Sequence, residues 1–221
     1  IDSLVDALAE WKEKINHFAG MDADIADLRK AYSRDRAAYT ELAERLHDSR
    51  ERLGKEFSRR LISELADMAM EAVRFEVRFE RFAGDASGTD TCLFMIAPNP
   101  GMPLRPLYDI ASGGEMSRIM LAIKSILSGA GNVETLIFDE IDTGIGGLVL
   151  TTVADKLEQL GEHEQVICVT HAPIIAARAD RNFYIEKSAV DGLTETHVTV
   201  LDTEDAVISE IARMSGSQDE W

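Results

Sequence analysis

The sequence of 221 residues predicts an α/β fold in which helices cover a largely parallel sheet, with an antiparallel hairpin and a long projecting coiled-coil helical arm. Three observations predict it. Residues 1–70 lack proline and carry apolar residues at alternating spacings of three and four. Residues 73–80 alternate between apolar and charged side chains, which is typical of a half-buried strand. Residues 113–213 alternate between helical and strand patterns.

The first 70 residues are expected to form the arm. One apolar seam of period 3.5 begins at Ile1, and a second seam, out of register with the first, begins at Ile25. Gly20 lies where the register slips, so we expect a helix break near Gly20 and then a long helix over about 23–70. At ~1.5 Å per residue that helix would be roughly 70 Å long, so it should project. Its seam needs a partner helix, unless it packs on the globular part.

The hairpin and the sheet follow as a domain over residues 71–221. A turn-rich stretch over 84–90 separates the strand at 73–80 from its expected partner at 92–96. We then expect helices over 113–128, 147–160, 173–178 and 205–213, and strands over 135–138, 165–169, 182–187 and 194–201. In a parallel sheet of this kind, ligands bind at the carboxyl ends of the strands, which is where the sequence places Asp139, Glu140 and His171.

Composition limits the possible partners. The formal net charge is −17; residues 1–119 carry 17 basic and 22 acidic side chains (−5), and residues 120–221 carry 6 and 18 (−12). An acidic surface repels phosphate backbones, so the C-terminal half is not expected to bind DNA by itself. The sequence contains no run of 18 apolar residues, so no membrane-spanning helix is predicted. Cys92 and Cys168 are expected to be buried thiols of a cytoplasmic protein. The start at Ile1, without Met, indicates a fragment.

Two adjacent carboxylates and a glycine pair are the candidate functional residues. Neighbouring strand residues point to opposite faces, so Asp139 and Glu140 should do different work: one can hold Mg²⁺ through water, and the other can act as general base. Small residues at 112–114 leave backbone N–H groups free at a helix N-terminus, which favours a phosphate. Each feature alone also has an ordinary structural explanation: a helix cap, a turn, or a structural histidine at His171.

The order of these motifs resembles that of the ABC-type ATPases over about Ser112–Ala179. In that family they are the signature motif, the Walker B strand, the D-loop at Ile141-Asp142 and the switch histidine. A closer resemblance is to the RecN family of SMC-like bacterial DNA-repair ATPases. It rests on the runs over 96–101, 106–107, 110–118, 137–147 and 169–173. The chain departs from that family at Ala172, where leucine is expected.

The resemblance implies an ATPase acting at DNA double-strand break ends in the bacterial cytoplasm, associated with the nucleoid, with ATP and Mg²⁺ as cofactors. It implies catalytic roles for Glu140 and His171 and a Mg²⁺ role for Asp139. The cofactor-binding residues that it implies are Ser112, Gly113, Gly114, Glu115 and Asp142. Because signature residues of one head contact ATP held by another head, it also implies a homodimer through ATP-bound heads.

One component of such a site has no counterpart in the sequence. A P-loop requires G-x-x-x-x-G-K-[ST], and the only Gly-Lys pair, Gly54-Lys55, lies in the arm with Ser49 in place of the first glycine. The chain is therefore expected to be an arm helix plus the C-terminal lobe of an ABC-type head, inactive without an N-terminal P-loop lobe. Two alternatives stay open: another SMC-like chromosome-maintenance ATPase, or a non-catalytic coiled-coil scaffold. A transporter ATPase fits the coiled arm poorly.

Overall fold

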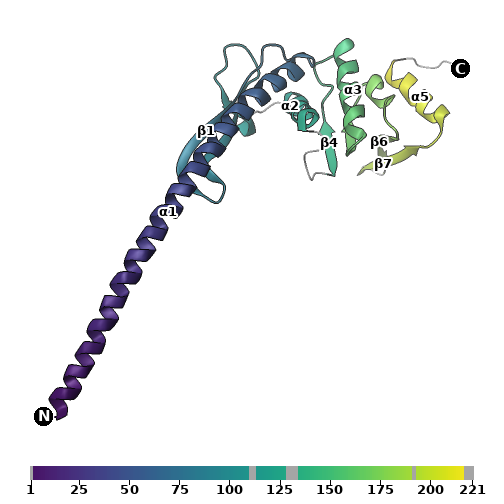
Figure 1. The fold of residues 1–221 in the computed structure, drawn as a ribbon. Coiled ribbons are helices and arrows are strands. Elements are labelled where there is room, and N and C mark those ends of the chain that lie inside the picture. Colours follow the sequence, from purple (N-terminus) through teal and green to yellow (C-terminus); the bar gives the residue numbers. More distant parts are fainter. Residues whose placement is uncertain (1, 110–112, 128–133, 191–192, 217–221) are drawn as a thin grey trace. The chain divides into compact units, whose positions relative to one another are not determined.

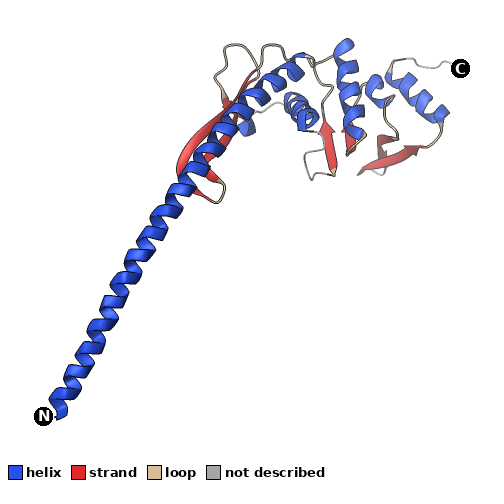
Figure 2. Cartoon of the chain, in the orientation of Figure 1, coloured by secondary structure: helices blue, strands red, loops and turns tan. Residues whose placement is uncertain are grey.

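The computed structural model describes residues 2–109, 113–127, 134–190 and 193–216. Figure 1 labels the main elements along the chain, and Figure 2 colours helices and strands separately. The helices are α1 (Asp2–Ala66), α2 (Gly113–Leu127), α3 (Leu148–Gly161), α4 (Pro173–Ala176) and α5 (Glu204–Met214), with a 3₁₀ turn at Leu107–Asp109. The strands are β1 (Arg74–Asp85), β2 (Gly88–Ala97), β3 (Arg105–Pro106), β4 (Thr135–Asp139), β5 (Gln165–Val169), β6 (Asn182–Val190) and β7 (Leu193–Leu201).

The chain divides into two compact units. The arm unit consists of Ile1–Leu53 and Phe79–Cys92, and the head unit consists of Gly54–Arg78 and Leu93–Trp221. Helix α1 and the strands β1 and β2 therefore each contribute residues to both units. None of the helices in the described part of the chain is long and apolar enough to cross a membrane.

Helix α1 corrects the expected break near Gly20, because it is continuous from Asp2 to Ala66. A glycine inside a helix costs only about 0.5–1 kcal/mol relative to alanine, and no proline interrupts the hydrogen-bond ladder. The helix also ends four residues before the expected Met70. Ala69 has φ of 59°, and the Met70 N–H donates to the Leu65 carbonyl at 3.0 Å, which is a Schellman-type end.

The apolar seams of α1 lie on the exposed surface of the arm unit. Leu4 is 74% exposed and Trp11 is 63% exposed. The other exposed seam residues are Leu8, Ile15, Phe18, Ile25, Leu28, Tyr32, Tyr39, Leu42, Leu46 and Leu53. Exposed large apolar side chains in a row are typical of a surface that pairs with another segment. Pairing of this helix stays a prediction.

The hairpin turn between β1 and β2 is much tighter than expected. Strand β1 continues to Asp85 and β2 starts at Gly88, which leaves only Ala86 and Ser87 between them. Gly84 and Gly88 have φ of 96° and 112°, a backbone that other residues rarely adopt. The Asp85 carboxylate accepts hydrogen bonds from the Ser87 hydroxyl (2.6 Å) and N–H (2.7 Å), which lower the pKa of Asp85. The sequence indicated a turn here, and the two glycines make it a short one.

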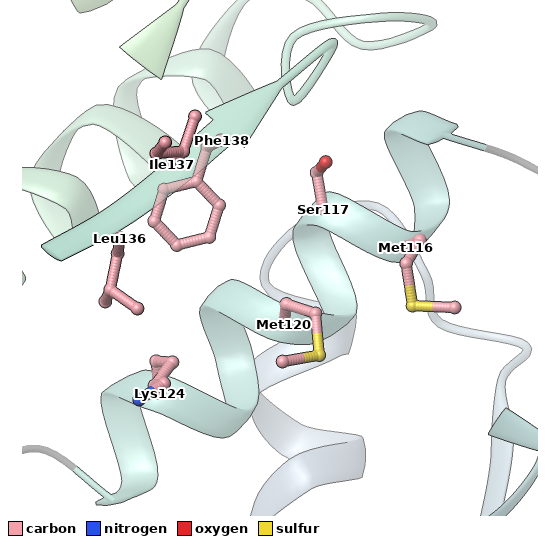
Figure 3. Close-up of a pocket in the computed structure, with 7 residues that line it drawn as sticks. All are labelled: Met116, Ser117, Met120, Lys124, Leu136, Ile137 and Phe138. Carbon is pink, nitrogen blue, oxygen red and sulfur yellow. The ribbon is translucent and has the colours of Figure 1, made fainter. Parts of the chain in front are cut away.

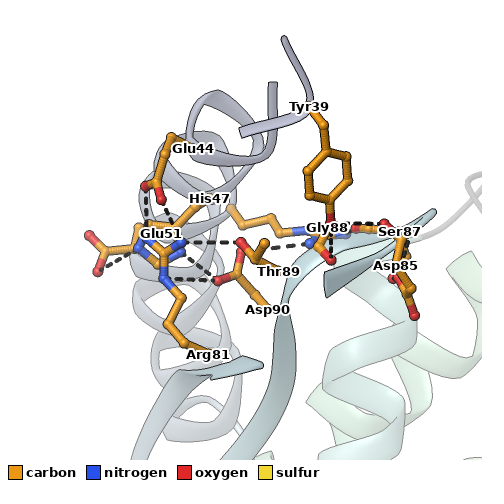
Figure 4. Close-up of polar contacts among 11 residues, drawn as sticks. Tyr39, Glu44, His47, Glu51, Arg81, Asp85, Ser87, Gly88, Thr89 and Asp90 are labelled. Carbon is orange, nitrogen blue, oxygen red and sulfur yellow. Dashed lines mark hydrogen bonds and ion pairs between the residues drawn. The ribbon is translucent and has the colours of Figure 1, made fainter. Parts of the chain in front are cut away.

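Polar contacts hold this hairpin tip against α1 within the arm unit (Figure 4). The Tyr39 hydroxyl lies 3.0 and 3.1 Å from the carbonyl oxygens of Asp85 and Gly88. The Arg81 guanidinium donates to both Glu44 carboxylate oxygens at 2.9 Å. These bonds raise the pKa of Arg81 and lower the pKa of Glu44. Paired donors and acceptors of this kind fix the orientation of the hairpin on the helix.

A buried carboxylate, Asp90, lies at the centre of the same contacts. Its side chain is 1% exposed and lies 2.9 Å from Nδ1 of His47, 3.4 Å from Nε of Arg81 and 3.7 Å from Nη1 of Arg50. A buried charge is tolerated only where opposite charges or donors surround it. The cationic side chains around Asp90 therefore allow a charged strand residue to face the helix.

Substituting Gly84 by Ala should destabilise the arm unit by about 1–3 kcal/mol, because a methyl group there would overlap the Tyr39 hydroxyl on a strained backbone. Gly20→Ala is the matched control: nothing lies within 4 Å of its added methyl, and we expect a gain of about 0.5–1 kcal/mol. Thermal unfolding followed by circular dichroism measures both. If Gly20→Ala lowers helix content, α1 is broken there in solution.

The core of the head unit forms around the end of α1 and the helices α2 and α3. Leu61, Leu65 and Met68 are completely buried, and Phe57, Phe75 and Phe94 form a cluster with ring centroids 5.6–6.0 Å apart. The other fully buried large side chains are Ile96, Ile119, Leu121, Ile141, Val153 and Leu160. The apolar positions of α2 and α3 recur at helical spacing, so each helix buries one face.

The sheets confirm the predicted α/β class and show how its parallel part is built. Strands β4 and β5 pair in parallel, in register from Thr135 opposite Gln165 to Asp139 opposite Val169. Strands β6 and β7 form an antiparallel hairpin of their own, and β1, β2 and β3 form a third sheet. The parallel pair is joined by α3, as expected for a crossover connection. It is this pair that positions the candidate site.

The two faces of the β4–β5 pair differ. Phe138 is buried, and Leu136, Val166 and Cys168 pack against the core. On the opposite face, Ile137 is 71% exposed, and Ile167 and Val169 are also exposed. Successive strand residues point to opposite faces, so one face of the pair covers the core and the other is open.

Candidate functional site

The carboxyl ends of β4 and β5 bring the sequence-predicted acidic pair and the histidine to one edge. Asp139 lies opposite Val169 in the parallel register, so Glu140 and Thr170-His171 leave the sheet at the same edge. Asp139 and Glu140 are both exposed, and the His171 side chain is 79% exposed. This is the placement that the alternating helix and strand pattern predicted.

Glu140 has an unusual backbone conformation. Its φ is 56°, in the left-handed region that disfavours residues with a side chain. The Thr143 N–H donates to the Glu140 carbonyl at 3.0 Å and closes a turn directly after the strand. The turn directs the Glu140 side chain away from the strand axis, toward the N-terminus of α2.

The glycines that begin α2 lie against Glu140. A methyl group on Gly113 would lie 2.6 Å from Oε2 of Glu140, and one on Gly114 would lie 2.8 Å from the Glu140 carbonyl oxygen. The Ser117 hydroxyl donates to the Asp139 carbonyl at 2.6 Å, which anchors the first turns of α2 to the strand end. The glycine pair therefore permits a close approach between helix and turn. Ser112 lies outside the described residues, and Glu115 is half-buried in the first turn of α2.

Gly114→Ala should destabilise the head unit by about 1–3 kcal/mol, because the added methyl meets a backbone carbonyl that has little freedom to move. Gly113→Ala is the matched comparison. Its methyl meets only the flexible end of the Glu140 side chain, so the free energy of unfolding should change by less than about 1 kcal/mol. Denaturant unfolding of both variants measures the difference. Equal losses would contradict the close approach described for Gly114.

Arg118 is a buried cation one turn further along α2. It is 7% exposed, and its Nη1 donates to the carbonyl oxygens of Thr143 (2.9 Å) and Ile141 (3.3 Å). Burial lowers the pKa of Arg118, since the charged form loses its hydration. The sequence assigned Arg118 no role, because an arginine in an amphipathic helix is ordinarily expected at the surface.

Asp142, to which the resemblance assigns cofactor binding, is buried and hydrogen-bonded within the head unit, and its role toward a cofactor stays a prediction. It is 3% exposed, and its Oδ2 accepts hydrogen bonds from the Thr170 hydroxyl (2.5 Å) and from the N–H groups of His171 (2.9 Å) and Ala172 (3.0 Å). The three donors of the β5–α4 loop hold the buried carboxylate against that loop. Thr170, to which sequence reasoning gave no role, is one of those donors.

The Cys168 thiol and an open groove also belong to the β4–β5 region of the head unit. Burial, with the nearby charges of Asp142 and Asp139, raises the pKa of Cys168 to about 12, so its thiol stays protonated at neutral pH. The groove runs between α2 and β4 (Figure 3) and is lined by Met116, Ser117, Met120, Lys124, Leu136, Ile137 and Phe138. This mostly apolar lining suits contact with other side chains rather than acid–base chemistry.

The donor set at the strand end is compatible with Mg²⁺. Within the described residues, no group of three or more His, Cys, Asp or Glu side chains could enclose a metal ion. Mg²⁺ needs no such cage, because it keeps several waters and is held by one or two carboxylates together with substrate phosphates. The exposed carboxylate of Asp139 fits that mode of binding.

Comparison with curated proteins identifies relatives over nearly the whole chain. The chain is 35% identical over 219 residues to the DNA repair protein RecN of Halalkalibacterium halodurans, covering 97% of the chain and 39% of that protein. It is 32% identical over 230 residues to RecN of Bacillus subtilis (97% and 40%) and 38% identical over 176 residues to RecN of Vibrio cholerae (79% and 32%). The chain resembles RecN. It spans about two fifths of the length of the RecN proteins from Halalkalibacterium halodurans and Bacillus subtilis.

Two other comparisons add little to the resemblance to RecN. No family model matches the chain. An Smc head domain with a coiled coil and joint from Pyrococcus yayanosii has a TM-score of 0.49 and 19% identity, over 72% of this chain and 29% of that one. An Smc head domain from Pyrococcus furiosus has a TM-score of 0.45 and 21% identity, over 70% and 37%. These TM-scores are too low to support inferences about individual residues.

Proposed function

We propose that this chain supplies the arm helix and the C-terminal head lobe of a RecN-like DNA-repair ATPase. The observation that supports this best is the convergence of three motifs at one sheet edge. The glycines of α2, the acidic pair after β4 and the histidine after β5 come from segments far apart in the sequence. Each motif alone has an ordinary structural explanation, whereas their convergence suits phosphoryl transfer.

Each residue at this edge has its own role in the proposed ATP hydrolysis. Asp139 would hold Mg²⁺ through water, and a bound Mg²⁺ ion would supply positive charge against the charge that develops on the phosphates. Glu140, whose carboxylate is exposed and beyond the strand, accepts a proton from the attacking water. His171 presents an exposed ring that contacts the γ-phosphate. The backbone N–H groups at the start of α2, with Ser112 and Glu115, contact the γ-phosphate of ATP held by a second head.

The site is composite and needs a P-loop, a motif that this sequence does not contain. Gly54-Lys55 does not supply one, since both residues lie within α1 and Gly54 is buried. The proposed arrangement is a homodimer in which each head contributes its own acidic pair and caps the nucleotide of the other head. By its likeness to RecN, the protein would act on DNA double-strand break ends, in the bacterial cytoplasm near the nucleoid. We place the arm at residues 1–70 and the lobe at 71–221.

The test compares this chain with the longer protein that contains it. The isolated chain should neither bind ATP tightly nor hydrolyse it, whereas the longer protein should do both and should form ATP-dependent dimers. Turnover by the isolated chain that disappears in Glu140→Gln would contradict the composite site. A longer protein that carries a P-loop lobe and shows no ATP-dependent turnover would contradict the proposed function itself.

A further inference from the structure

We propose that Asp142 is a positioning residue for His171, and that Arg118 holds the loop that carries Asp142. Arg118 and Asp142 are the buried charged residues among the described residues of the head unit. Asp142 is the central residue of the Ile141–Thr143 turn, and Arg118 contacts this turn from α2. The catalytic consequence rests on the proposed function, whereas the positioning itself can be measured without nucleotide.

One carboxylate oxygen of Asp142 accepts a hydrogen bond from the main chain of His171 and lies beside the ring of the same residue. Oδ2 accepts from the His171 N–H at 2.9 Å and lies 3.2 Å from Nδ1 of the same residue. It also accepts from the Thr170 hydroxyl and the Ala172 N–H, whereas the buried Oδ1 has no hydrogen-bond partner. So many donors on one oxygen restrict the loop on both sides of the histidine.

This contact selects one tautomer of His171. A carboxylate only accepts hydrogen bonds, so the ring nitrogen facing it, Nδ1, carries the proton. In the neutral ring, Nε2 is then left with its lone pair on a side chain that is 79% exposed. Nε2 is then the ring nitrogen that can accept a hydrogen bond or a proton from a bound group. A histidine without this carboxylate would sample other rotamers and the other tautomer.

Arg118 fixes the turn from the opposite side. Its guanidinium donates to the carbonyl oxygens of Ile141 and Thr143, the residues immediately before and after Asp142. Both bonds come from Nη1, which lies one covalent bond further from Cα than the Nζ of a lysine, so a lysine would not reach both carbonyl oxygens in the same way. Arg118 also belongs to α2, whose first residues contact Glu140. A shift of the α2 N-terminus would therefore reach His171 through the turn and Asp142.

The first experiment reads the ring tautomer directly. Nitrogen-15 NMR of the histidine rings of this chain, with His171→Ala to assign the signal, should show the Nδ1–H form for His171. Asp142→Ala should shift that ring toward the Nε2–H form, and Asp142→Asn, which keeps an acceptor oxygen, should largely retain the Nδ1–H form. His197, paired with Glu195 on β7, is the internal control and should not change. An Nε2–H ring in the parent chain would overturn the proposal without any variant.

The second experiment tests Arg118. Arg118→Lys should increase hydrogen exchange of the Thr143 amide, which closes the turn, and should shift the His171 ring signals. Arg178→Lys is the matched control, because Arg178 makes only exposed ion pairs with Asp155 and Glu158. If Arg118→Lys leaves both the amide and the ring unchanged, Arg118 does not hold this turn.

The third experiment links the positioning to chemistry in the longer protein. If Asp142 acts through His171, the double variant Asp142→Ala/His171→Ala should turn over ATP no more slowly than His171→Ala alone. Rate losses that multiply would show that Asp142 acts independently of His171. Absence of turnover in the parent protein would refute the proposed function, while the tautomer measurement would still decide the positioning role.

Discussion

Glu140→Gln in the longer protein should slow ATP turnover by about 10²–10⁴-fold, the usual contribution of a general base, while ATP binding persists. The amide keeps the size of the side chain and loses its ability to accept a proton. In the proposed composite site ATP joins the two heads, so unhydrolysed ATP should leave dimers to accumulate. Turnover, nucleotide binding and sedimentation with ATP measure the three effects.

Asp139→Asn separates the roles of the adjacent carboxylates. Asp139 lies at the last position of β4, opposite Val169, and is assigned to Mg²⁺. Its variant should weaken binding of the Mg²⁺–ATP complex itself and should therefore lose the dimer as well as turnover. If both variants bind ATP equally well and dimerise equally, the two carboxylates do not have separate roles. Parent-rate turnover by Glu140→Gln would remove Glu140 as the base.

Ser112→Arg should abolish ATP-dependent pairing of heads while each head still binds nucleotide. A long cation at the start of α2 would occupy the space that the γ-phosphate of the partner's ATP requires in a composite site. Ser215→Arg, at the exposed end of α5, is a control that adds the same side chain elsewhere on the head unit. Nucleotide binding and sedimentation in the presence of ATP distinguish the two variants.

Mixing heads provides the sharper form of this test. A Ser112→Arg head and a head with a defective P-loop can together form at most one intact composite site. Activity in the mixture should therefore not exceed half that of the parent, and neither variant should be active alone. If Ser112→Arg still dimerises with ATP, the signature residues do not face a partner's nucleotide.

The types of the elements could be predicted because apolar periodicity decides which face of a segment is buried. The strand at 135–138 and the helix at 147–160 match β4 and α3 within one residue at each end. Apolar periodicity could not decide whether the helix breaks at Gly20. A change of seam register signals a change of partner, whereas helix continuity depends on backbone propensity, and one glycine weakens that only slightly. The seam itself is exposed in the described arm unit, so its register does not decide where the helix ends.

The placement of the candidate site was also predictable in part. Parallel strands that alternate with helices bring their carboxyl ends together, which placed Asp139, Glu140 and His171 at one edge. The inward turn of Asp142 and the burial of Arg118 were not predictable, because both depend on hydrogen bonds between segments distant in sequence. A pattern of apolar residues carries no information about such contacts.

The left-handed backbone at Glu140 costs folding free energy at a position that the proposed function assigns to catalysis. A residue with a side chain gives up roughly 1–2 kcal/mol in that conformation, which glycine would not. Glu140→Gly should therefore yield a head unit that tolerates more heat and more denaturant, whereas the same change in the longer protein would remove the proposed base. Selecting the longer protein for thermal resistance alone would then favour a variant without ATP turnover. A screen for stabilised forms must therefore measure turnover alongside melting temperature.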